Sequence, residues 1–191
     1  MMYQDVIRNA FAPLILDDEK HSYFFNNWEL VTFERNELIT EAGRLEKYFY
    51  VVLEGVQVIY ILTADGEKKV IGFSYNGSFS GIYDSFLSNK VSRYFLEAVT
   101  PSKLVRISKK RYDDWLVNYP EFNKWGRILH QELLIGRVDR EVELITKNAK
   151  QRFECFMKRC PRELRGIPQK YLASYLNMTP ETYSRLRADK S

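Results

Sequence analysis

The sequence predicts an α+β fold, in which an N-terminal antiparallel β-barrel is followed by a long helix and then by two short helices joined by a turn. Three observations predict it. Residues from about 28 to 110 hold six of the nine glycines and many β-branched or aromatic residues, with turn signals roughly every 8 to 12 residues. After Tyr112 the spacing becomes helical, and the C-terminal segment carries two further short helical patterns. A chain of 191 residues suits one compact unit with an appendage.

The composition excludes several classes of protein. The longest apolar runs, such as residues 56–62, are about a third of the length that a membrane crossing needs, and the first ten residues lack a hydrophobic signal core. We therefore expect a cytoplasmic protein with no membrane partner. Cys155 and Cys160 lie five residues apart, about 140° around a helix, which opposes joint metal binding. We interpret them as packing residues and expect no metal site.

The barrel is expected within residues 1–115, after a short helical lead-in that ends near residue 27. Residues 48–62 indicate two strands that meet at Glu54-Gly55, and Asp65-Gly66 indicates a hairpin between residues 57–62 and 68–73. A further strand pair is expected at residues 93–99 and 104–108, joined at Thr100-Pro101-Ser102.

A long helix is expected next, over residues 116–148, in a helical run that begins near Pro120 and continues to about Arg159. Apolar positions recur along it with heptad spacing, which predicts a seam that packs against a second copy of the chain. The alternative is that this stripe packs only on its own barrel, a role that the second row at Leu129, Leu133 and Leu144 could fill instead. The expected seam residues are Ile128, Gln131, Ile135, Val138, Val142 and Ile145.

Residues 149–191 contain the most specific pattern, a helix, a tight turn and a second helix. Asn177 tolerates the left-handed backbone that ends a helix, Thr179 is a good N-cap, and Pro180 suits the first helical position. Glu181 and Arg185 lie four residues apart on the outer face of the second helix. A carboxylate can accept from cytosine N4 and a guanidinium can read guanine, so this pair predicts base contacts. The alternative is an exposed surface ion pair.

The charge distribution favours the same function. From Lys147 to the end there are 11 basic and 4 acidic residues, a net charge of +7, which leaves −3 on the first 146 residues of a chain whose total is +4. Clustered Lys and Arg gain affinity for phosphates by releasing counterions, so the basic quarter predicts a polyanion partner. An evenly solvated charged surface is the alternative.

The barrel, the helix with its seam and the stretch from Thr179 to Arg187 together resemble the bacterial Crp/Fnr superfamily of transcription regulators, over nearly the whole chain. The resemblance implies a jelly-roll barrel like a cyclic-nucleotide-binding domain, and a homodimer bound to double-stranded DNA at a two-fold operator, with RNA polymerase as a further partner. It places base contacts at Glu181 and Arg185. We expect the phosphate contacts at Gln169, Lys170, Thr179, Thr182, Arg187 and Lys190.

Two departures from the family pattern affect this segment. Pro180 stands where the family usually has an arginine, so one base contact is lost. Ser191 follows directly on the recognition helix, so we expect the β-wing of the relatives to be absent, with fewer phosphate contacts and a more salt-sensitive complex.

The phosphate cassette of the family is also altered in the barrel. Gly77 and Gly81 match it, but Ile82 stands where the ribose-binding Glu would be, and Ser92-Arg93 reverses the order of the family's Arg and Ser. Isoleucine cannot accept a hydrogen bond from the ribose 2′-hydroxyl, so we do not expect cyclic AMP to bind. An unidentified small effector, or no ligand at all, remains open. The candidate effector pocket is Gly81, Ile82, Ser92 and Arg93.

Other chemistries lack their residues. No cysteine precedes Cys155 to hold an iron–sulfur cluster, and His21 and His130 are the only histidines, too few to indicate a haem site. No P-loop, dinucleotide loop or zinc motif occurs, so we expect neither an enzyme nor a bound cofactor. The competing hypothesis to a DNA-binding regulator is a ligand-binding or protein-interaction module that does not bind DNA.

Overall fold

The computed structural model describes residues 3–12, 14 and 18–189. Its barrel consists of two four-stranded antiparallel sheets, with the strand orders β1-β8-β3-β6 and β2-β7-β4-β5. The α+β jelly-roll architecture predicted from the sequence is confirmed. The strands are β1 (Glu29–Phe33), β2 (Leu38–Thr40), β3 (Tyr48–Glu54), β4 (Gln57–Leu62), β5 (Lys68–Ser74), β6 (Phe79–Ser80), β7 (Phe95–Ala98) and β8 (Ser102–Ser108).

The turns explain two of the predicted strand boundaries. Gly55, between β3 and β4, has a φ of +98°, and a Cβ there would lie 2.6 Å from the carbonyl oxygen of Pro101, so only glycine fits. β4 and β5 pair as an antiparallel hairpin from Leu62 and Lys68 to Gln57 and Ser74, as Asp65-Gly66 predicts.

The predicted pairing of residues 93–99 with residues 104–108 is wrong. β7 pairs with β2 and β4, whereas β8 pairs with β1 and β3 in the other sheet. The segment around Pro101 is therefore a crossing between the sheets and not a hairpin turn. A proline there is compatible with both connections, because in either case it sits outside a ladder.

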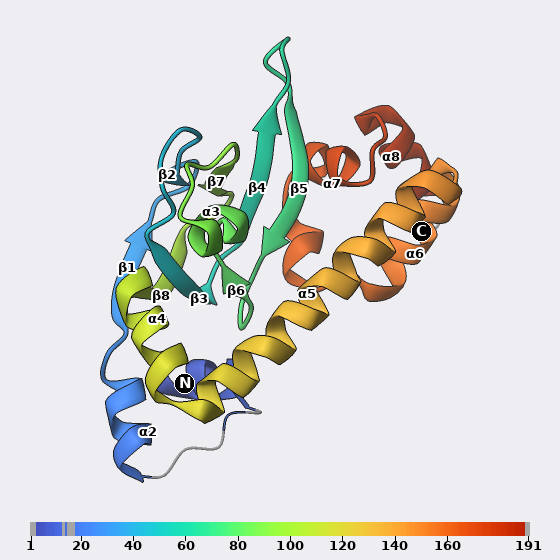
Figure 1. The fold of residues 1–191 in the computed structure, drawn as a ribbon. Coiled ribbons are helices and arrows are strands. Elements are labelled where there is room, and N and C mark those ends of the chain that lie inside the picture. Colours follow the sequence, from blue (N-terminus) through green and yellow to red (C-terminus); the bar gives the residue numbers. More distant parts are fainter. Residues whose placement is uncertain (1–2, 13, 15–17, 190–191) are drawn as a thin grey trace.

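Helices pack at one end of the barrel, and the long helix leads from there to a further group of helices beside it (Figure 1). Four of them are α1 (Tyr3–Ala10), α2 (Asp18–Phe25), α3 (Tyr83–Ser88) and α4 (Lys109–Asn118). The long helix α5 (Pro120–Thr146) runs from the N-terminal helices to the opposite end of the molecule, where α6 (Ala149–Arg159), α7 (Gln169–Tyr175) and α8 (Pro180–Ala188) lie. A short 3₁₀ segment, Glu163–Gly166, connects α6 to α7.

The long helix is shorter than the sequence predicts. It begins at Pro120, as predicted, and the expected domain boundary at residue 116 falls within the separate helix α4, residues 109–118. It ends at Thr146 and does not continue to Arg159. Asn148 starts α6 with a capping box, in which its side chain accepts from the Gln151 N–H and the Gln151 side chain accepts from the Asn148 N–H. These reciprocal bonds fix a helix start and interrupt the run.

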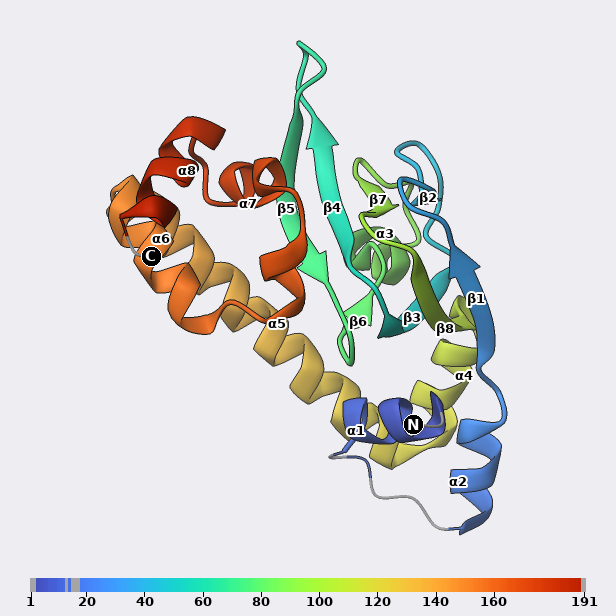
Figure 2. The same ribbon diagram turned by 180° about the vertical axis from the view of Figure 1, so that it is seen from behind.

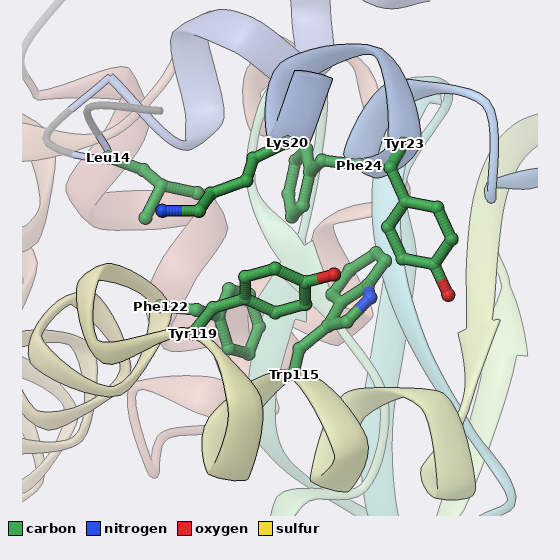
Figure 3. Close-up of a pocket in the computed structure, with 7 residues that line it drawn as sticks. All are labelled: Leu14, Lys20, Tyr23, Phe24, Trp115, Tyr119 and Phe122. Carbon is green, nitrogen blue, oxygen red and sulfur yellow. The ribbon is translucent and has the colours of Figure 1, made fainter. Parts of the chain in front are cut away.

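An aromatic core joins the N-terminal helices to the barrel and to the start of α5. Phe11, Phe24, Trp115 and Phe122 are all buried within it. Figure 3 shows the contact between α2 and the α4–α5 corner, where the rings of Trp115 and Phe122 face Phe24. The gap between them has a volume of about 10 Å³, room for about one water molecule, so we interpret it as a packing gap and not as a binding site.

A second core joins the barrel to the C-terminal helices. Val58, Tyr60 and Val70 of the β4–β5 hairpin pack in one cluster with Tyr171 and Leu172 of α7. Both views show α7 beside β5 (Figures 1 and 2). Apolar interfaces restrict the motion of one domain on another, so the C-terminal helices have a defined position on the barrel in this structure.

Candidate nucleic-acid interface

The last two helices, α7 and α8, form a helix-turn-helix. Asn177 has a φ of 51°, the left-handed conformation predicted for it, and the Met178 N–H donates to the Ala173 carbonyl, closing α7. Thr179 then caps α8, because its hydroxyl accepts from the Thr182 N–H at 3.2 Å, and Pro180 follows at the first helical position. The turn therefore starts α8 at a fixed residue and direction.

The inner face of this unit is a compact apolar core. Tyr183 of α8 is buried and meets Phe153 of α6 edge to face, with 5.4 Å between ring centroids. Leu172 and Ala173 of α7 are also buried, and Ala173 is small enough for the helices to cross closely. This burial decides which face of α8 is left outside.

Glu181 and Arg185 are both exposed, on the face of α8 opposite Tyr183. Hydrogen bonds from its own backbone N–H and from the Thr179 hydroxyl lower the pKa of the Glu181 carboxyl, and the helix N-terminus favours the same charge. The carboxylate is therefore ionised at neutral pH, the state that accepts from a base amino group. The arrangement presents one acceptor and one forked donor outward.

The residues expected at phosphates occupy different environments. Lys170, Thr179 and Arg187 are exposed, while Gln169 and Thr182 are half-buried. The Thr179 and Thr182 hydroxyls lie 3.2 Å apart within the cap of α8. Lys190 lies outside the described residues.

Three arginines fix this unit against the rest of the chain. Arg152 donates to the carbonyls of Leu176 and Asn177, at 2.8 and 3.0 Å, and so holds the turn of the helix-turn-helix. Arg159 forms a bidentate pair with Glu143 across α6 and α5, at 2.7 and 2.6 Å. Arg140 donates to the Tyr175 carbonyl at 2.7 Å and stacks on its ring. No sequence motif predicts this structural role for the three arginines, two of which belong to the basic C-terminal quarter.

The expected seam of α5 is an exposed apolar stripe in the single chain. Ile135, Val138, Val142 and Ile145 are 50 to 76% exposed, and Gln131 is exposed as well. Ile128 is half-buried, nearer the barrel. Of the second row, Leu129 is buried in the aromatic core, but Leu133 is 40% exposed and so serves the barrel only in part. A contiguous exposed apolar stripe on one helix is typical of an interface.

A cavity of about 640 Å³ lies between β5, α3 and the middle of α5. Gly81, Ile82 and Arg93 line it, whereas Ser92 does not. Ser92 is buried, and its hydroxyl donates to the Tyr94 carbonyl and accepts from the Tyr94 N–H. Much of the remaining wall is apolar, and it includes Ile59, Ile71, Phe73, Leu133 and Leu134.

Two polar groups at this cavity lie outside the candidate effector pocket expected from the sequence. The hydroxyl of Tyr83 and Nε2 of His130 are buried without a hydrogen-bond partner among the described residues. Burial lowers the pKa of His130, so its ring is neutral at pH 7. The Arg93 guanidinium donates to the Tyr94 hydroxyl at 3.0 Å. Tyr83 and His130 come from different elements, and no local pattern links them.

The described part of the chain contains neither a metal-binding cluster nor a membrane-spanning helix. No group of three or more His, Cys, Asp or Glu side chains is placed to hold a metal ion. None of the described helices combines the length and apolarity needed to cross a membrane.

The fold and the exposed helix-turn-helix define the class of protein. Residues 30–119 match the family model of the cyclic nucleotide-binding domain. Together with α5 and the terminal helices, this domain gives the architecture of Crp/Fnr-type transcription regulators, so the resemblance noted in the sequence is confirmed.

Individual relatives agree with this class. The chain is 25% identical to the nitrogen fixation regulation protein FixK of Bradyrhizobium diazoefficiens, over 94% of this chain and 78% of FixK. The structure of FixK2 from Bradyrhizobium japonicum superposes with a TM-score of 0.71 at 19% identity, covering 85% of this chain and 83% of FixK2. The c-di-GMP-responsive regulator CLP of Xanthomonas campestris gives 0.68 at 16% identity, covering 91 and 93%. The chain is thus homologous to Crp/Fnr-type transcription regulators such as FixK.

Proposed function

We propose that this chain is a homodimeric, sequence-specific DNA-binding transcription regulator and not an enzyme. Residues 1–115 act as the sensor, 116–148 as the dimerisation helix and 149–191 as the reader. The observation that carries the proposal is the exposure of Glu181 and Arg185 on α8, with Tyr183 buried behind them. Two such helices, about 34 to 36 Å apart in a dimer, enter successive major grooves.

The remaining contacts follow from this placement. Glu181 and Arg185 discriminate base pairs, while Lys170, Arg187 and the residues at the α8 cap hold phosphates. The regulator acts in the cytoplasm, where bacterial DNA lies, and its output passes through RNA polymerase.

The cavity beside α5 is the proposed place of an effector. Ile82 offers no acceptor for a ribose hydroxyl, whereas the apolar wall with Arg93, Tyr83 and His130 suits a largely apolar molecule with one or two polar groups. We do not propose a cyclic nucleotide as this effector.

Selection of bound duplexes from a random pool tests the reading of DNA. A two-fold motif is expected, and enrichment without any motif would refute sequence-specific binding. Arg185→Ala should then lose about 1 to 3 kcal/mol of affinity, concentrated at one position of each half-site. Arg162→Ala removes the same charge from another exposed residue and should leave that preference intact.

A salt series separates this function from an interaction module that does not bind DNA. Affinity for duplex DNA should fall steeply with salt, and Lys170→Ala should reduce the slope while weakening all sequences alike. Affinity for duplex DNA that is negligible even at low salt would favour the interaction module.

A further inference from the structure

Helix α7 of the reader is attached to the free edge of a barrel sheet. β5 ends the order β2-β7-β4-β5, so its outward backbone groups have no neighbouring strand. The Ser174 side chain of α7 bonds to these backbone groups instead. The Val70 N–H donates to Ser174 Oγ at 2.9 Å, and Ser174 Oγ donates to the Lys68 carbonyl at 3.0 Å. One side chain thus satisfies a donor and an acceptor of the edge strand.

A buried carboxylate strengthens the same attachment. Glu97 of β7 is buried, and one of its oxygens accepts from Tyr60 at 2.9 Å and from Lys68 at 2.5 Å. Its other oxygen lies 3.4 Å from the hydroxyl of Tyr171 on α7. The hairpin and the reader therefore share a polar network beside their common apolar core.

This attachment places the hairpin beside the phosphate-contacting side of the reader. A groove of about 560 Å³ separates them, bordered by residues 67–70 of the hairpin and by Lys170, Thr179 and Pro180. Both views show the hairpin extending past α7, with its tip beyond the reader helices (Figures 1 and 2). A recognition helix in a major groove about 12 Å wide has a phosphate strand on each side. On the side of Lys170, that strand would have to enter this groove.

The charges of the hairpin balance one another and give little net attraction for such a phosphate strand. Lys68 pairs with the buried Glu97, and Lys69 forms an exposed pair with Glu67 at 2.7 Å, so each lysine has a carboxylate beside it. Asp65 at the tip adds a further exposed carboxylate. The hairpin therefore excludes a DNA strand by its volume and not by its charge.

We propose that this structure is a closed state, in which the β4–β5 hairpin, held to α7 by Ser174, blocks DNA from the reader. Release of α7 from β5 then raises DNA affinity. The inference rests on the proposed DNA-binding function, and Ser174 is a positioning residue in it, with no contact to DNA required.

Ser174→Ala tests the attachment without altering the charge of the chain, so a gain in DNA affinity cannot come from simple electrostatics. Hydrogen exchange of the full chain, followed by mass spectrometry, should be faster over residues 66–74 and unchanged over β3 and β8. Affinity for the selected duplex should rise by about fivefold or more, because two ordinary hydrogen bonds shift a two-state equilibrium by at least that factor. Ser88→Ala is the control, since its hydroxyl bonds within its own helix, α3.

Unchanged exchange over residues 66–74 overturns the attachment. Faster exchange with equal or weaker DNA binding overturns the blocking role of the hairpin. Absence of DNA binding by the unmodified chain and by both variants overturns the proposed function, and with it this role, even where exchange shows that Ser174 holds the strand. Tyr171→Phe, which removes only the hydroxyl beside Glu97, should act in the same direction with a smaller effect.

Discussion

Truncation of Ile135 on α5 should weaken self-association about 100-fold. Ile135 is 60% exposed in the single chain, so about three-fifths of its side chain is available to a second copy. Replacement by alanine removes three carbons, each worth about 0.8 kcal/mol when buried, or about 1.4 kcal/mol per chain after that fraction is applied. A two-fold interface contains the residue twice, which gives about 2.9 kcal/mol and the stated change in the dimer dissociation constant.

Sedimentation equilibrium over a dilution series measures this constant directly. Val117→Ala is the control, because Val117 is 81% exposed on α4 and lies outside the stripe. Its dimer constant should equal that of the unmodified chain. If Ile135→Ala dimerises as tightly as the unmodified chain, or if Val117→Ala weakens the dimer equally, the reasoning from the exposed stripe is refuted.

Three further predictions concern the reader, its attachment to α5 and the cavity. Asn177→Ala should lower the free energy of unfolding in urea by about 1 kcal/mol, because alanine disfavours the φ of 51° at this position. Asn177→Gly should not lower it, and equal losses of stability in the two variants would contradict a backbone cause. The Arg159 guanidinium lowers the pKa of Glu143 in the folded chain, and this partly exposed pair contributes about 0.5 kcal/mol of stability. That contribution is present above the unfolded pKa near 4.3 and is lost as pH falls through the folded pKa. Glu143→Gln should therefore lose less stability than the unmodified chain between about pH 5 and 3, and parallel curves would contradict this. Saturating cyclic AMP should not raise the melting temperature, and a clear rise would contradict the argument from Ile82.

The features that the sequence predicted best depend on local backbone chemistry. Asn177, Thr179 and Pro180 each have a conformational preference that acts within a few residues, and all three adopt it. Gly55 and Asp65-Gly66 mark their turns for the same reason. The start of α6 was also readable, since Asn148 and Gln151 have the spacing of a capping box, but the apolar heptads that continue through Ala149 concealed it.

The features that the sequence did not predict depend on tertiary partners. Alternation of apolar residues identifies β7 and β8 as strands but does not state which strand each one joins, so the two were paired wrongly. Ser174 lies on a short helix with no motif around it, and its partners are backbone groups about 100 residues away. Ser92 was expected at the cavity because the family's cassette pairs a Ser with its Arg, yet here its hydroxyl bonds to the Tyr94 backbone and it does not line the cavity.

Strand β5 connects the parts that a regulator must couple. Residues 68 and 70 hold α7 through Ser174, and residues 71–74 line the cavity. Ile71, directly after Val70, is the extra residue of a bulge, and its carbonyl accepts from Arg137 of α5 at 3.0 Å. Coupling between sites requires an element with two positions whose equilibrium both sites bias. A ligand that binds more tightly when β5 is released from Ser174 would therefore raise DNA affinity, by as much as it prefers the released position. A ligand that binds both positions of β5 equally would leave DNA affinity unchanged.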